Sequence, residues 1–310
     1  MTHVMWNAPD VIFVVCSMVT LPVYFTILVL LIRNRKATGF HIPFYWLIIS
    51  QGIADLFYLI TYVTFIVFAY ICFSTKVNPA LTRIVTNIVV RVLTFCLTLR
   101  CMGVMLISFQ RYTALCLWSS TKFAWVNKGS PVRFVAIQWI VSGVVVFPIL
   151  PVINSNLGPT RVYALVFDAI SYKVLALVMY ISVFSTFAIC IFCYGAVLRQ
   201  IFCKLSAVRS TSKKVVREVQ LCIQAAVFVF AFFILFVFYL YECVLILCAI
   251  PPPAIFELIH PVVSGFLSYV VPWTLLFFNK EVSALFKKTF GIPVPVQLYR
   301  PSASWTTGVK

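Results

Sequence analysis

The sequence predicts an all-α membrane protein in which seven transmembrane helices form one bundle. Three observations lead to this fold class. The 310 residues are 63% hydrophobic and only 10% charged, whereas soluble domains carry about 25% charged residues. The hydrophobic residues gather in seven runs, each close to or above the roughly 20 residues that span a bilayer. Lys and Arg concentrate in alternate connecting segments, the pattern of a multi-span protein with a fixed orientation.

The first three predicted spans have clear boundaries. Residues 10–32 form an apolar run that ends at the basic segment 33–36. Residues 43–73 form the second span, which is long enough to tilt or to project beyond the bilayer. Residues 84–110 form the third span, although two arginines interrupt its apolar character.

The last four spans are followed by a short surface helix. Residues 134–153 form the fourth span, which ends near two prolines, and residues 174–198 form the fifth. Residues 219–249 form the sixth and contain the aromatic run FVFAFFILFVFYLYE, and residues 258–279 form the seventh. Residues 280–290, KEVSALFKKTF, are then predicted to form a short amphipathic helix that lies along the membrane surface.

The distribution of Lys and Arg predicts the orientation. Of the 24 Lys and Arg residues, 18 fall in the segments on the C-terminal side of the membrane and 4 on the opposite side. By the positive-inside rule the N-terminus is outside and the C-terminus is in the cytosol. Residues 1–290 then form a single seven-span domain, and residues 291–310 form a flexible cytosolic tail.

The basic charge and the cysteines do not indicate other classes of function. The net charge of +17 comes from short segments between apolar runs, with no continuous basic face for nucleic acid. The sequence Cys190-Ile-Phe-Cys193 has no second pair to complete a zinc site. No acid in a span has a second acid, His or Cys at matching depth. The sequence therefore predicts no enzyme, no metal site, no cofactor and no nucleic-acid partner.

Asp55 and Arg100 are predicted to form an ion pair inside the bundle. Charged residues at mid-membrane usually face the bundle interior and pair with one another. Arg100 precedes Arg111 by eleven residues, which places both within about 20° of one helix face and about 16 Å apart. Asp55 lies at a similar depth in the second span. The alternative is that the two charges are solvated independently in a wet core. Arg91, nearly opposite Arg111 and close to the outer end, is expected to snorkel to the interface.

The triplet Gln110-Arg111-Tyr112 falls at the predicted cytosolic end of the third span. In a seven-span protein this triplet resembles the acid-Arg-Tyr motif of G-protein-coupled receptors. The resemblance implies that Arg111 and Tyr112 belong to a switch that contacts a G protein. Gln110 departs from the pattern, so the local acid–Arg pair is absent and either higher basal activity or another partner for Arg111 is implied. The alternative is an arginine that snorkels to the interface.

A narrower resemblance comes from three segments. QRYTALCLWSSTKFAW is similar to the segment after the third helix of nematode serpentine chemoreceptors, in which Arg111, Tyr112, Thr113, Ala114 and Trp125 fit and Gln110 and Trp118 depart. ISQGIADLFYL in the second span and VVPWTLLFFNKEV at the end of the seventh fit the same group. The chain is identified as a member of the Srg superfamily, class Srv, with Sru and Srg as neighbouring classes.

The resemblance implies a chemosensory receptor for a small environmental ligand that signals through a heterotrimeric G protein. It implies a plasma-membrane location, at sensory cilia. Basic residues that precede the sixth span would contact the G protein; they are Lys213, Lys214 and Arg217. Attraction of this basic segment to anionic lipid is the other role, and both can hold. In the outer third of that span, Phe238 and Tyr239 share a helix face with Glu242, and the three are candidate ligand contacts. An interfacial aromatic belt explains them equally well.

Comparison with rhodopsin-like receptors suggests a role for the internal pair. In those receptors the acid at the position of Asp55 and the residue at the position of Arg100 help to line a sodium site. The resemblance therefore implies that the Arg100 guanidinium replaces the sodium ion. The competing functional interpretations are a multi-span transporter and a membrane protein that does not signal. Transporters often have helices broken by Gly or Pro. This chain has only 10 Gly and no Pro in the fifth and sixth spans, so it offers little support for a transporter.

Overall fold

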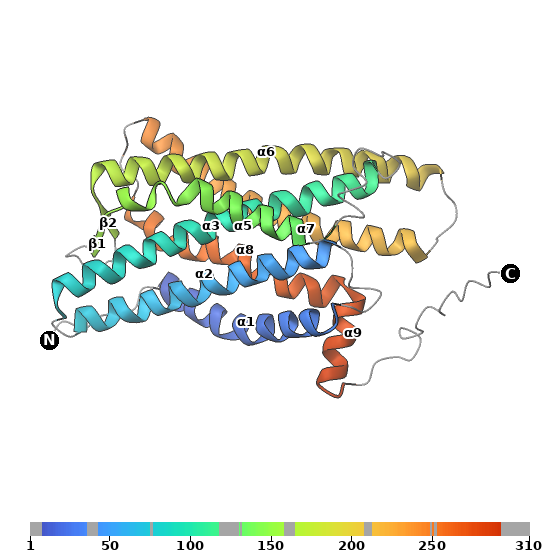
Figure 1. Cartoon of the computed structure of the whole chain (residues 1–310), viewed down its shortest axis with the longest axis horizontal. Helices are drawn as coiled ribbons and strands as arrows, with labels where there is room; N and C mark the ends of the chain where they lie inside the picture. Colours follow the sequence, from blue (N-terminus) through green and yellow to red (C-terminus); the bar gives the residue numbers. More distant parts are fainter. Residues whose placement is uncertain are drawn as a thin grey trace.

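A computed structural model describes residues 8–35, 43–74, 77–117, 130, 132–157, 165–207, 213–248, 250 and 253–292. Within these residues the chain forms a transmembrane helix bundle (Figure 1). Six of the helices are long and apolar enough to cross a membrane, and one shorter apolar helix lies among them. The helices are α1 (Ala8–Arg33), α2 (Pro43–Ser74), α3 (Pro79–Cys116), α5 (Val132–Val146), α6 (Ala169–Ala207), α7 (Lys213–Leu247), α8 (Ala254–Phe278) and α9 (Lys280–Thr289).

Helix α3 is the central element of the bundle. It packs against α2, α5, α6 and α7, and it buries a larger share of its apolar stretch than any other described span. The outer faces of the surrounding helices instead expose large apolar side chains such as Val144, Phe192 and Phe277. Such an apolar exterior is unusual on a soluble protein and is the surface that contact with lipid requires.

Helix α5 is shorter than the predicted span 134–153. It ends at Val146, and a turn leads to the short 3-10 helix η2 (Leu150–Val152). Pro148 and Pro151 explain the difference, because proline lacks the N–H that a helix needs and its ring clashes with the preceding turn. The apolar run therefore continues to the predicted end, but its last part is not α-helical.

Helix α3 is longer than the predicted span 84–110 at both ends. The Asn78 side chain accepts a hydrogen bond of 2.9 Å from the backbone N–H of Ala80, and Pro79 occupies the first helical position. This is a favourable helix start. The helix continues past Arg111 to Cys116, so the Gln110-Arg111-Tyr112 triplet lies inside it and not at its end. The charged Arg111 ends the apolar run of the third span, but the backbone remains helical beyond it.

The basic segment between the fifth and sixth spans is also more helical than predicted. Helix α6 continues to Ala207, beyond the predicted end at 198, and α7 begins at Lys213, before the predicted start at 219. In Figure 1 both helices extend beyond the others at the same end of the bundle. Only residues 208–212 of the connection lie outside the described part of the chain.

Two small elements lie at opposite ends of the bundle. Strands β1 (Ser155–Leu157) and β2 (Leu165–Phe167) pair antiparallel, with Ser155 opposite Phe167, at the predicted outer end. The sequence did not predict these strands. At the other end α9 runs across the direction of the bundle (Figure 1), as expected for a surface helix. The Asn279 side chain caps its start by accepting a hydrogen bond of 3.1 Å from the Val282 N–H. Most of the predicted tail, residues 293–310, lies outside the described residues.

Candidate functional site

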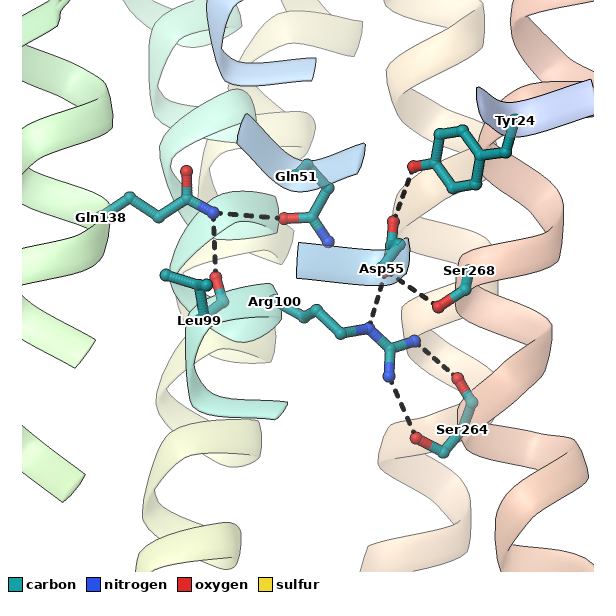
Figure 2. Close-up of polar contacts among 8 residues, drawn as sticks. All are labelled: Tyr24, Gln51, Asp55, Leu99, Arg100, Gln138, Ser264 and Ser268. Carbon is teal, nitrogen blue, oxygen red and sulfur yellow. Dashed lines mark hydrogen bonds and ion pairs between the residues drawn. The ribbon is translucent and has the colours of Figure 1, made fainter. Parts of the chain in front are cut away.

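Asp55 of α2 and Arg100 of α3 lie together at the centre of the bundle (Figure 2). Arg100 Nε is 2.9 Å from Asp55 Oδ1, and both side chains have no exposed surface. At this distance and depth, either charge alone would carry a large desolvation cost that the pairing offsets. The structure thus brings the two predicted partners together as an ion pair.

Neutral side chains from two further helices complete the ion pair. Tyr24 of α1 donates a hydrogen bond of 2.8 Å to Asp55 Oδ2, and Ser268 of α8 donates one of 2.9 Å to Asp55 Oδ1. The guanidinium donates to the Ser264 hydroxyl at 3.2 Å and to the Ser264 carbonyl at 2.6 Å. The ion pair therefore joins α1, α2, α3 and α8 in one polar cluster, which we call the central cluster: Tyr24, Asp55, Arg100, Ser264 and Ser268.

An aromatic ring and a proline-rich helix shape the central cluster. The Tyr58 ring lies 4.4 Å from Arg100 Cζ, in the range of a cation–π contact. Ser264 and Ser268 are four residues apart and so lie on the same face of α8. That helix contains Pro261 and Pro272, which limit its backbone hydrogen bonding on either side of the two serines.

A second polar cluster joins α5 to α2 and α3. The Gln138 side chain accepts a hydrogen bond of 2.7 Å from Ser50 and donates one of 3.0 Å to the Leu99 carbonyl. Its amide nitrogen also lies 3.5 Å from Gln51 Oε1 (Figure 2). Gly103 makes this approach possible, because a Cβ at that position would collide with the Gln51 and Gln138 side chains. One segment of α2 thus contributes to both polar clusters, with Ser50 and Gln51 in the second and Asp55 in the central cluster.

Arg111 is buried at the inner end of the bundle. It is 1% exposed, and its Nε donates a hydrogen bond of 2.8 Å to Gln110 Oε1. Its guanidinium carbon lies 4.2 Å from the centre of the Phe44 ring at the start of α2. A neutral amide thus contacts the arginine where the related motif has an acid. Such a contact is weaker than a charge-assisted pair, and burial shows that Arg111 does not snorkel to the interface.

The other predicted switch residues lie near Arg111 in sequence or in space. The Tyr112 ring is half-buried and lies 5.9 Å from the Phe192 ring of α6. Lys213, Lys214 and Arg217 form the first turns of α7. Their side chains lie outside the described part of the structure.

The predicted ligand contacts lie in an aromatic cluster in the outer half of the bundle. Tyr239 is 4% exposed, and its hydroxyl is 3.0 Å from His260 Nε2 of α8. The Phe238 ring stacks on Phe256 of α8 at 4.9 Å. Glu242, one helical turn further along α7, is half-buried. The structure therefore turns Tyr239 into the bundle and links α7 to α8 through it.

Arg91 contacts the backbone directly after the 3-10 helix η2. Its Nη2 donates a hydrogen bond of 3.2 Å to the carbonyl of Ile153, and the side chain is partly exposed. Sequence analysis placed it near the outer interface, and the structure adds the backbone partner.

Sequence analysis missed the neutral members of both clusters. Tyr24, Gln138, Ser264 and Ser268 are all buried, yet none is charged, so none stood out in the apolar runs. The spacing of the two serines by four residues in α8 was the available signal. Within the described ranges, His, Cys, Asp and Glu form no group of three that could hold a metal ion.

Comparison with known proteins adds the family. A family model described as "Serpentine type 7TM GPCR chemoreceptor Srv" matches residues 13–292. The match begins at Phe13 within α1 and covers the rest of the bundle and α9. A search of curated proteins found no match.

Proposed function

The chain belongs to the Srv class of serpentine seven-helix chemoreceptors, and we propose that it detects a small environmental ligand at its outer half and signals through a heterotrimeric G protein. The membership makes it a multi-pass membrane protein with a chemosensory, receptor-like role. The ligand, the G protein and a location in the plasma membrane at sensory cilia are the proposed parts. The observation that carries the coupling step is Arg111, buried at the inner end of α3 with a neutral hydrogen-bond partner in Gln110.

The electrostatics of this contact suggest how the switch works. An arginine keeps its charge in any environment and offers five donors, so it can exchange partners without losing its proton. Since Gln110 is neutral, release of Arg111 costs less here than release from a carboxylate would. The α7 residues Lys213, Lys214 and Arg217 would add positive charge to the same end of the bundle, where an acidic surface of a G protein would dock.

The aromatic cluster supports an outer ligand site. The Tyr239 hydroxyl and His260 Nε2, which are 3.0 Å apart, form a polar pair next to the rings of Phe238 and Phe256, and ligand sites typically combine apolar walls with a few convergent polar groups. Glu242 lies one turn away and would favour a ligand that carries a positive charge or a hydrogen-bond donor.

The coupling step can be tested without a known ligand. Full-length receptor in lipid nanodiscs is mixed with a purified heterotrimeric G protein, and basal binding of a non-hydrolysable GTP analogue is measured. We expect exchange above that of empty nanodiscs for the wild type, and exchange at the background level for Arg111→Ala. Arg91→Ala, at the other end of the same helix, is the matched control and should behave as the wild type.

The opposite results would count against the proposal. If Arg111→Ala folds and exchanges as fast as the wild type, Arg111 is not part of the coupling surface. If the wild type promotes no exchange with G proteins of any of the main classes, the non-signalling interpretation gains support.

A further inference from the structure

The connection between the fourth span and α6 is fastened to α3 by a side chain. Strands β1 and β2 form a hairpin in this connection, which we call the outer hairpin, and it lies against α3 and α6 (Figure 1). Asn87 Oδ1 of α3 accepts a hydrogen bond of 2.7 Å from the Ser155 N–H and one of 3.1 Å from the Ser155 hydroxyl. Ser155 is buried. Its N–H and its hydroxyl are therefore withdrawn from water, and one amide oxygen accepts from both.

The same connection is fastened to the first turn of α6. The Ser171 hydroxyl donates a hydrogen bond of 2.7 Å to the Val152 carbonyl and accepts one of 2.9 Å from the Asn154 N–H. Ser171 has no exposed surface. The Asp168 side chain caps α6 by accepting a hydrogen bond of 3.2 Å from the Ser171 N–H. The segment 152–155 thus joins α3 on one side to the start of α6 on the other.

Hydrogen bonds alone form this fastening, which we call the outer clasp: Asn87, Ser155 and Ser171. Residues 150–172 contain no cysteine, and the cysteines in the described ranges are free thiols. Disulfides form readily in segments that face the outside of a cell, but residues 150–172 cannot form one. Each hydrogen bond of the clasp is weak on its own. The clasp can therefore open and re-form without a covalent step.

The outer clasp holds a helix that contributes to the aromatic cluster. Helix α6 runs without interruption from Ala169 past Tyr180. The Tyr180 ring meets the Tyr239 ring of α7 nearly edge-on, with 6.1 Å between the ring centres. A shift of the first turn of α6 would therefore move one wall of that cluster. This consequence for ligand binding rests on the proposed function, whereas the clasp itself does not.

We propose that Asn87 is a positioning residue, which holds the outer hairpin and the start of α6 against α3 as a reversible restraint that needs no disulfide. An amide oxygen has two lone pairs, so it can accept both bonds from Ser155. An apolar residue at position 87 would leave the buried Ser155 N–H without its acceptor, which is costly. The alternative is that apolar packing, such as that of the fully buried Ile153, fixes the hairpin without help from Asn87.

Hydrogen exchange separates the two explanations. Full-length receptor in lipid nanodiscs is prepared as wild type, Asn87→Ala, Asn87→Asp and Ile88→Ala. Deuterium uptake is followed by mass spectrometry in one peptide around residues 152–157 and one around residues 169–176, with and without a reductant. Ile88 is the next residue of α3 and is 54% exposed, so its substitution is the matched control for a change at this end of the helix.

The variants should differ by what position 87 can accept. Asn87→Ala should raise the rate of exchange about 10-fold in both peptides, because local opening no longer breaks the two bonds to Ser155. The contact of Arg91 with the Ile153 carbonyl remains, so the segment loosens without detaching. Asn87→Asp should keep the wild-type rate, since a carboxylate oxygen accepts the same two bonds. Ile88→Ala should exchange as the wild type, and the reductant should not change the wild-type rate.

Four results would overturn the proposal. Wild-type exchange in Asn87→Ala would show that packing holds the hairpin. Faster exchange near residues 152–157 with an unchanged rate near residues 169–176 would show that the clasp does not position α6. An Asn87→Asp protein that exchanges as fast as Asn87→Ala would show that the acceptor is not the cause. Faster exchange of the wild type in reductant would show that a disulfide contributes. Because the readout is hydrogen exchange at the outer end, none of these results bears on G-protein coupling.

Discussion

Replacing Arg100 by methionine is expected to destabilise the bundle more than any other single change in its core. Methionine keeps most of the apolar stem but removes the charge 2.9 Å from Asp55 and both donors to Ser264. Asp55 would remain buried, with only the hydroxyls of Tyr24 and Ser268 as donors. The variant thus leaves a carboxylate without its counter-charge.

The size of the effect follows from the distance and the burial. With an effective dielectric constant of about 20, Coulomb's law gives about 6 kcal/mol for two charges 2.9 Å apart. Desolvation of both ions offsets most of this gain, but loss of one partner from a buried pair still costs about 3–5 kcal/mol. At about 2 °C per kcal/mol, the unfolding temperature should fall by about 6–10 °C.

A double-mutant cycle separates the pair from its surroundings. Receptor in lipid nanodiscs is unfolded by heat as Arg100→Met, Asp55→Asn and the double variant. Asparagine keeps one acceptor oxygen for either the Tyr24 or the Ser268 hydroxyl, and its NH2 group donates to the other hydroxyl oxygen. The double variant carries no unpaired charge, so it should be more stable than the sum of the single effects predicts, by about 2–3 kcal/mol. Arg91→Met, at a partly exposed site on the same helix, should lower the unfolding temperature far less.

Two results would refute this reasoning. Additive effects of the two single substitutions would show that Asp55 and Arg100 do not stabilise one another. An Arg100→Met protein as stable as Arg91→Met would show that the guanidinium is solvated in the folded receptor, which is the wet-core alternative.

Three smaller changes give independent checks. Gly103→Ala should lower the unfolding temperature by the equivalent of about 1–3 kcal/mol, because the added methyl group collides with the Gln51 and Gln138 side chains. The control Gly195→Ala, which meets no atom within 4 Å, should be neutral or stabilising. Equal effects of the two substitutions would contradict the close packing at Gly103. Asn78→Ala should cost about 0.5–2 kcal/mol in the same assay through loss of the α3 cap, and an unchanged unfolding temperature would mean that the cap is not formed. Gln110→Glu should lower basal nucleotide exchange, because a carboxylate holds Arg111 more strongly than an amide does; unchanged exchange would argue against Gln110 as a restraint.

The sequence predicted the bundle and the charged pair because both depend on regular geometry. Spans follow from hydrophobic length, and Asp55 and Arg100 follow from depth and from the 100° rotation per residue. The partners of the pair depend on how α1 and α8 are rotated, which is decided by packing against the rest of the bundle. Tyr24 and Ser264 could therefore not be chosen among the other polar residues of their spans.

The predicted bounds differ from the structure where charge or proline affects the pattern. A hydrophobicity argument ended the third span at Gln110, although the backbone of α3 continues to Cys116. The same argument carried the fourth span through two prolines, although α5 ends at Val146. In both places hydrophobic length was taken for helix length, and these are separate properties of the chain.

The order in which the central cluster is assembled along the chain bears on biosynthesis. As the polypeptide leaves the ribosome, Tyr24 enters the membrane first, Asp55 follows on α2, and Arg100 follows on α3, whereas Ser264 and Ser268 emerge more than 160 residues after Arg100. A lone Asp or Arg at the centre of a span costs about 2.5–3.5 kcal/mol to insert. Because the opposite charges sit on consecutive spans, each can shield the other as soon as α3 is released. The first three helices should therefore stay together in the bilayer until α8 inserts and its Ser264 and Ser268 complete the central cluster.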